Sequence, residues 1–301
     1  MRIPKSVKKN EYGFYEVAVK PTPAELEKYY ANQFYQDCVT VSYAKKYTDA
    51  EMTYINNKNG EAAAIIKKYF GSDLTGKKYL DIGCGEGFTV KHFSFEGCTV
   101  SGLDYSDYGI KSHNPDMLDF FQQCDILEYC KQLIKRKARF DIINLDNVLE
   151  HVIDPIGLLN DIWNLLADRG VLRIQVPNDF SPCQEELFRL HKVNRHYWIS
   201  MPGHLSYFNA GSLKKLLTTM NFNIITVLGD YPIEFFLFND NTNYVNNPEV
   251  GKSCHESRVF TENFLYRADF EKTVKLYEAM GELGIGRVMT FYVTKRGGVE
   301  K

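Results

Sequence analysis

"YLDIGCGEGF", residues 79–88, places three glycines at alternate positions directly after an apolar run. Gly83, Gly85 and Gly87 carry no Cβ, so a turn built from them brings the backbone close to a ligand at the start of a helix. Asp81 lies two residues before the first glycine. Taken alone, the stretch is as compatible with a tight turn that binds nothing, so its interpretation depends on the rest of the chain.

Two further acids follow, each where a strand is expected to end. Asp104 ends "VSGLD", 23 positions after Asp81, and Asp125 lies in "QCDIL". An acid at the end of the second strand of such a unit accepts hydrogen bonds from ribose hydroxyls. Asp125 is suited to an adenine amino group, with Ile126 against the ring. The spacing G-x-G-x-G differs from the dinucleotide fingerprint G-x-G-x-x-G, which disfavours NAD.

Strand-like and helix-like segments alternate from about residue 77 to 177. This rhythm predicts an α/β fold with a parallel sheet, helices on both faces and a ligand at the carboxyl ends of the strands. A helix is expected from Asp154 to Gly170, a loop over 178–208 and a further strand over 222–229. The first 75 residues are expected to hold one short strand and then helices.

Bulk composition bounds the function classes. The 301 residues are 44% hydrophobic and 25% charged, which is ordinary for a globular protein. The net charge of −2 argues against a nucleic-acid-binding face. The seven cysteines form no C-x-x-C pair, and no apolar run reaches the length of a membrane span. We therefore expect a cytoplasmic protein with neither signal peptide nor membrane contact.

With an acid at three successive strand ends, the chain resembles the class I S-adenosylmethionine-dependent methyltransferases. "FDIINLDNVLEHVIDP", residues 140–155, is similar to the fourth motif of their ubiquinone-biosynthesis-like branch. The resemblance implies a Rossmann-like, doubly wound, seven-stranded sheet whose last strand, about 287–295, is antiparallel. It also implies a methyltransferase domain over 76–301, with 178–208 and 231–286 covering the substrate. Residues 1–75 would then form an N-terminal helical extension and substrate lid.

The same resemblance implies S-adenosyl-L-methionine as cofactor and S-adenosyl-L-homocysteine as product. Asp81 would contact the amino end of the methionine part, and Asn147 would lie near the sulfonium. The residues implied in cofactor binding are Asp81, Gly83, Gly85, Asp104, Tyr105, Asp125, Ile126, Asp146 and Asn147.

Candidate catalytic residues are histidines, since a base is needed when the methyl acceptor is an alcohol. His204 lies in "GHLSYF", which is similar to "EHLSYF" of deoxysugar C-methyltransferases, but Gly203 replaces the glutamate. His204 is the candidate base, or else pins its loop through the two ring nitrogens. His196 is a weaker candidate, and His151 is as suited to ordering the cofactor pocket as to catalysis.

The expected acceptor is a small molecule: a sugar, a nucleotide-linked sugar, or a related polysaccharide or secondary-metabolite precursor, methylated on oxygen. The alternatives are an RNA or protein methyltransferase, and a non-catalytic binding module that keeps the fold. No metal site is expected, because the sequence holds no H-x-x-x-H or C-x-x-C pattern. The oligomeric state stays open, with a homodimer among the possibilities.

Overall fold

A seven-stranded sheet with strand order β5-β4-β3-β6-β7-β10-β9 organises the computed structural model, which describes residues 3–22, 24–25 and 46–297. Strand β10 pairs antiparallel with β7 and β9, while the other pairs are parallel, so the predicted antiparallel last strand is confirmed. The strands are β3 (Lys78–Ile82), β4 (Thr99–Asp104), β5 (Phe121–Gln123), β6 (Phe140–Asp146), β7 (Leu166–Pro177), β9 (Phe222–Gly229) and β10 (Val288–Lys295).

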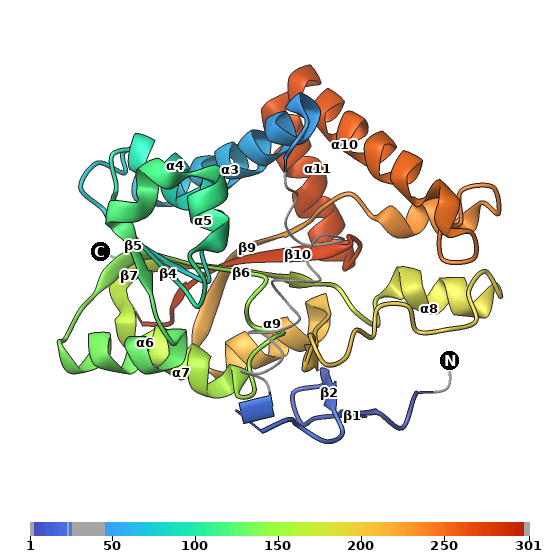
Figure 1. Cartoon of the computed structure of the whole chain (residues 1–301), viewed down its shortest axis with the longest axis horizontal. Coiled ribbons are helices and arrows are strands. Elements are labelled where there is room, and N and C mark those ends of the chain that lie inside the picture. Colours follow the sequence, from blue (N-terminus) through green and yellow to red (C-terminus); the bar gives the residue numbers. More distant parts are fainter. Residues whose placement is uncertain (1–2, 23, 26–45, 298–301) are drawn as a thin grey trace.

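Helices cover both faces of this sheet (Figure 1). One layer holds α3 (Asp49–Phe70), α4 (Phe88–Phe95), α5 (Tyr108–His113), α10 (Gly251–Ala268) and α11 (Phe270–Leu283), and the other holds α6 (Ile126–Lys135), α7 (Pro155–Leu165) and α9 (Ala210–Thr219). Successive strand residues therefore enter different cores: Tyr79 packs toward α3 and α4, and Leu80 toward α6 and α7. Among the described helices, none has both the length and the apolar character needed to cross a membrane.

A second, three-stranded sheet joins the N-terminal segment to the segment after β7. It has the order β1-β2-β8, with β1 at Val7–Lys9, β2 at Tyr15–Val17 and β8 at Ser206–Tyr207. The amide of Val17 also donates to the carbonyl of Leu205, at 3.0 Å. The N-terminal strands thus fix residues 205–207. Residues 26–45 of the predicted lid lie outside the described residues.

The structure corrects three sequence predictions. The first 75 residues, as far as the structure describes them, hold two short strands, β1 and β2, where one was expected. The predicted loop over 178–208 contains helix α8 (Pro182–Arg189), because Ser181 caps it in a reciprocal bond with Gln184 and Pro182 occupies its first turn. The helix expected to reach Gly170 ends at Leu165, since Leu166 already pairs with Phe140 in the sheet. The region 231–286 holds α10, α11 and two 3-10 helices (Ile233–Phe238 and Pro248–Val250).

The glycine turn after β3 depends on left-handed backbone. Gly83 has a φ of 77°, and a Cβ added there would lie 2.4 Å from Cγ2 of Val148. Val148 belongs to the loop that follows β6, so the two neighbouring strand ends meet without room for a side chain between them. Gly76 also has a left-handed φ, 75°, but a Cβ there meets nothing within 4 Å.

We expect Gly83→Ala to lower the free energy of unfolding by more than about 2 kcal/mol, because backbone strain adds to the clash with Val148. Gly76→Ala is the matched control and should cost only about 1 kcal/mol, the backbone component. Urea denaturation of both variants measures this. Gly83→Ala combined with Val148→Ala should lose less than the sum of the single changes. Equal losses for Gly83→Ala and Gly76→Ala would contradict the close approach.

Candidate active site

Acids at the carboxyl ends of four strands face one edge of the sheet. Asp81 is the penultimate residue of β3, Asp104 and Asp146 end β4 and β6, and Asp125 follows β5 after one residue. The strand register shows that these strand ends are adjacent, since Asp81 pairs with Gly102 and Asp104 with Gln123. Parallel strands bring these ends together, so the sequence prediction that they gather at one edge is correct.

Asp104 is fixed by backbone donors. Its Oδ2 accepts from the amide of Gly85 at 2.9 Å, and its Oδ1 accepts from the amide of Ser106 at 3.0 Å. The glycine turn is also hydrogen-bonded to strand β4, because the amides of Gly83 and Cys84 both donate to the carbonyl of Leu103. The carboxylate is 9% exposed. Two backbone amides therefore fix the orientation of the Asp104 carboxylate at the end of β4.

Asp125 begins helix α6, where its Oδ1 accepts from the amides of Leu127 and Glu128. Burial, and after it the charge and hydrogen bond of Asp125, raise the pKa of the Tyr105 hydroxyl. Ile126, the first residue of α6, is buried. Asp125 and Ile126, the two residues predicted to hold an adenine ring, therefore lie together, and Tyr105, a further predicted cofactor residue, is beside Asp125 and is 45% exposed.

Asp81 is buried within a network that crosses three strands. It accepts from the hydroxyl of Thr89 in α4 and, at 2.8 Å, from Nδ2 of Asn144 in β6. Arg173 of β7 donates to Asn144 Oδ1 at 2.8 Å and to Asp146 Oδ2 at 2.9 Å. Burial raises the pKa of Asp81 to about 6 despite these donors. Asp81 is only 1% exposed.

Asn147 occupies a strained position directly after β6. Its φ is 52°, in the left-handed region that few non-glycine residues adopt. Its amide donates to the carbonyl of Gln175 at 3.0 Å, and its side chain donates to Asp146 Oδ1 at 2.9 Å. Such strain persists only where surrounding bonds enforce it, and it concentrates at functional sites.

A second cluster lies in and beyond the loop after β6, where the structure brings together Glu150, His151 and His204. One oxygen or nitrogen from each lies within 4.8 Å of the others. The carbonyl of Glu150 accepts from the amides of Leu205 and Ser206, which holds the His204 loop against β6. Nδ1 of His151 bonds with the carbonyl of Gly203 at 2.8 Å. Carboxylate and imidazole groups are also ligands for divalent metal ions. The expectation that the protein holds no metal therefore remains a prediction.

Burial perturbs all three groups. It raises the pKa of Glu150 to about 8. It lowers the pKa of His151, and it lowers that of His204 to about 3, with His151 and Arg287 as further causes. Both imidazoles are therefore neutral at neutral pH. Oε2 of Glu150 and Nδ1 of His204 are buried without a hydrogen-bond partner among the described residues. Perturbed and unsatisfied groups of this kind mark candidate functional sites.

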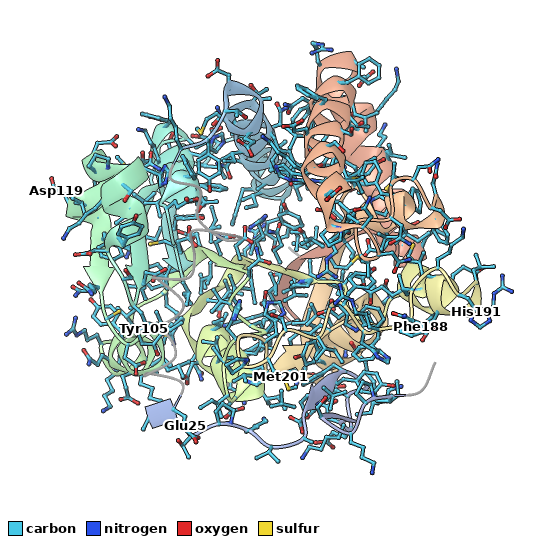
Figure 2. The ribbon with its side chains drawn as sticks, turned by 45° about the vertical axis from the view of Figure 1, so that its right-hand side comes forward. Glu25, Tyr105, Asp119, Phe188, His191 and Met201 are labelled. Atoms are coloured by element: carbon cyan, nitrogen blue, oxygen red, sulfur yellow. The ribbon has the colours of Figure 1, made fainter. Side chains whose placement is uncertain are left out.

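His196 is not part of this cluster. Its ring packs against Phe188 at 4.8 Å and Trp198 at 5.2 Å between centroids. Phe188 lies in α8 at one side of the molecule, well separated from Tyr105 at the other (Figure 2). The structure therefore groups two of the three predicted histidines and places the third in an aromatic cluster.

Sequence reasoning missed a buried ion-pair cluster at the same edge. Arg287, just before β10, donates to Asp179 Oδ1 at 2.9 Å and lies 3.8 Å from Glu234 Oε1. Asp179 Oδ2 and Glu234 Oε2 are buried without partners among the described residues. These residues are more than 50 positions apart in the chain, so no local motif could reveal them. Glu150 could have been identified from the sequence, since it directly precedes the candidate residue His151.

Comparison with known families and curated proteins now adds to this geometry. A family model described as "Methyltransferase domain" matches residues 54–227, more than half of the chain. A ubiquinone biosynthesis O-methyltransferase of Psychrobacter cryohalolentis is 27% identical over 170 residues, 54% of this chain and 66% of that protein. One from Glaesserella parasuis is 31% identical over 133 residues, 42% of this chain and 51% of that protein. The chain thus spans between half and two thirds of these relatives' length.

Solved structures share the fold. A 1,6-didemethyltoxoflavin-N1-methyltransferase of Burkholderia thailandensis, with bound 1,6-didemethyltoxoflavin and S-adenosylhomocysteine, aligns with a TM-score of 0.52. It is 14% identical and covers 97% of this chain and 99% of its own. The plantazolicin methyltransferase BamL aligns at 0.53, with 15% identity over 90% of this chain and 94% of its own. At these identities the likeness shows the fold alone.

Glu150 makes the free energy of unfolding depend on pH. The folded state binds its proton more tightly than the unfolded chain, so the protonated folded state is favoured at low pH and stability falls as pH rises from about 4.5 to about 8. Glu150→Gln removes this loss. We expect its free energy of unfolding to exceed that of the parent by a few kcal/mol at about pH 8, with the difference shrinking toward about pH 5.

The control is Glu186→Gln, an exposed glutamate paired with Arg189. Urea denaturation across the pH range compares the two variants with the parent. The difference between Glu186→Gln and the parent should not grow between about pH 5 and about pH 8. A pH-independent difference for Glu150→Gln would show that this carboxyl is not held protonated.

Proposed function

The chain belongs to the methyltransferase domain family, and we propose that it transfers a methyl group from S-adenosylmethionine to a hydroxyl of a small, sugar-like acceptor. The observation that carries the proposal is the convergence at one sheet edge. The glycine turn and the acids of β4, β5 and β6 lie there together with Glu150, His151 and His204. S-Adenosylhomocysteine would be the product.

The residues present fit this cofactor. Gly83 and Gly85 turn with left-handed backbone and place no side chain at their own positions. Asp104, fixed by two amides, would accept from the ribose hydroxyls. Asp125, Tyr105 and Ile126 would border the adenine. Asp81 is too buried to reach a ligand freely, so it would act on the amino end through an intervening water.

The cofactor supplies, when bound, a methyl group already activated on a sulfonium sulfur. The chain's residues then position the acceptor and receive its proton. In that transfer the acceptor oxygen would gain the methyl group while the electron pair of the broken carbon–sulfur bond would remain on sulfur, so the chain's own residues would have to receive the hydroxyl proton. Burial lowers the pKa of His204 to about 3, so its ring is neutral and would first accept a hydrogen bond from the hydroxyl, taking the proton only as the new carbon–oxygen bond makes that hydroxyl strongly acidic. Glu150, largely protonated near neutral pH, lies in the same 4.8 Å cluster and would offer a hydrogen bond there and no negative charge.

The acceptor class follows from the unpartnered oxygens. Glu150 Oε2, Asp179 Oδ2 and Glu234 Oε2 are buried carboxyl oxygens that lack hydrogen-bond partners among the described residues. A buried polar atom without a partner is costly, and hydroxyl groups, which both donate and accept, would supply partners to carboxyls in either protonation state. This favours a sugar or nucleotide-linked sugar over an acceptor with a single polar group. The near-neutral net charge of the chain argues against an RNA acceptor.

Turnover with labelled S-adenosylmethionine and a panel of free and nucleotide-linked sugars and phenols tests the proposal. We expect label in at least one sugar and His204→Ala to lower kcat by about 100-fold or more. The affinity for S-adenosylhomocysteine should stay unchanged in this variant, since His204 is not among the residues proposed to bind the cofactor.

His196→Phe is the matched control, because it preserves ring packing against Phe188 and Trp198. Its kcat should stay within a few-fold of the parent. Intact turnover in His204→Ala would overturn the assignment of the base. Label in phenols but in no sugar would overturn the acceptor class while leaving the methyl transfer in place.

A further inference from the structure

A cavity of about 440 Å³ lies on the outer side of α4, away from the sheet. Phe88, Lys91 and Phe95 of α4 line it, at spacings of three and four residues that share one helix face. The opposite face of α4 packs on the sheet through Val90 and Phe93, which are almost fully buried. The cavity therefore does not belong to the strand-end site.

Two lysines, Lys46 and Lys91, line the cavity, and none of its described lining residues is an Asp or Glu. His92 and His113 also line it, but burial lowers the pKa of His92, so that ring adds no positive charge near neutral pH. Lys91 lies 3.0 Å from Asp116, which is half exposed and does not line the cavity. The amide-bearing side chains of Asn56 and Asn114 add hydrogen-bond donors. Clustered lysines of this kind suit a phosphate.

The same cavity offers aromatic surface. The rings of Tyr47, Phe88 and His113 lie 5.3 to 5.8 Å from one another between centroids. Phe95 lines the cavity and is 78% exposed, which is unusual for a side chain of its size. Aromatic rings beside cations are what a planar base attached to a phosphate would stack on and pair with.

One carboxyl group adjoins these rings. Glu86, in the glycine turn, accepts from the Tyr47 hydroxyl at 2.7 and 2.8 Å and lies 3.3 Å from Nε2 of His113. Burial raises its pKa to about 7, so much of its negative charge is lost near neutral pH. Its repulsion of an anion is weakened accordingly, and it orients Tyr47 and His113 toward one another.

We propose that this cavity binds a nucleoside phosphate, with the base against Phe88 and Phe95 and the phosphates at Lys46 and Lys91. The ligand has two possible sources: the nucleotide part of the methyl acceptor, or a separate nucleotide. Both demand the same combination of an aromatic ring and an anion. The site rests on residues that the proposed methyl transfer does not use, so the two proposals can fail independently.

Calorimetric titration of uridine diphosphate into the full chain, with S-adenosylhomocysteine saturating, tests the site. We expect saturable binding that Lys46→Gln with Lys91→Gln weakens at least tenfold. Lys111→Gln is the matched control: it changes a lysine of the neighbouring helix α5 that pairs with Asp107 outside the cavity, and should bind as the parent does. Phe95→Ala should weaken binding without removing a charge. Uridine and inorganic pyrophosphate alone should each bind more weakly than the diphosphate.

No binding of uridine diphosphate, or equal binding by the double variant and the Lys111→Gln control, would overturn the proposal. Pyrophosphate binding as tightly as uridine diphosphate would overturn the nucleoside class. Turnover separates the two sources. If methyl transfer occurs only on sugars linked to uridine diphosphate, and Lys46→Gln raises their KM, the nucleotide belongs to the acceptor. If free sugars are methylated equally well, the nucleotide is a separate ligand.

Discussion

The hydrogen bond from the amide of Gly85 to Asp104 is the contact on which the arrangement of the strand ends depends. It ties the turn after β3 to the end of β4, at 2.9 Å, while the amides of Gly83 and Cys84 bond to Leu103. The left-handed glycines make this approach possible, because a Cβ at Gly83 would strike Val148 beyond β6. The ends of the neighbouring strands β4, β3 and β6 are thereby tied to one another.

Burial sets the chemistry on either side of this turn. Asp81 and Glu150 are each 1% exposed and have raised pKa values, which the chain accepts at some loss of stability near neutral pH. Asp81 is surrounded by donors from Thr89 and Asn144, so its charge serves to order the sheet edge. Glu150 has an oxygen without a donor, beside two neutral histidines. The second arrangement is unfavourable for folding alone, which makes it the better candidate for catalysis.

Much of this was predictable from local patterns. Acids that end strands at Asp104 and Asp146, glycines at 83 and 85, and the alternation of strands with helices all act over a few residues, and the structure places them as expected. Helix α8 was missed because Pro182 reads as a breaker, although a proline in the first turn suits a helix capped by Ser181. The end of α7 was missed because Leu166 continues the apolar period, and only its pairing with Phe140 ends the helix.

The acceptor side could not be predicted in the same way. Arg287, Asp179 and Glu234 meet only after β10 inserts between β7 and β9, which brings distant segments to one edge. His204 gains its neighbours because β2 and the carbonyl of Glu150 fix residues 205 and 206 from opposite sides. Long-range pairing of this kind leaves no periodic trace in the sequence. His196 shows the converse, since a histidine in an aromatic-rich segment can simply complete a packed cluster.

The most direct measurement of the central claim is the affinity of S-adenosylhomocysteine for the parent chain and for Asp104→Asn, by calorimetric titration. We expect one site per chain, weakened at least tenfold by the substitution, because the amide replaces an acceptor by a donor beside the ribose position. Asp107→Asn, on the neighbouring α5, should bind as the parent does. No binding by the parent chain, or equal affinity in parent and Asp104→Asn, would contradict the assignment of the strand-end edge as the cofactor site.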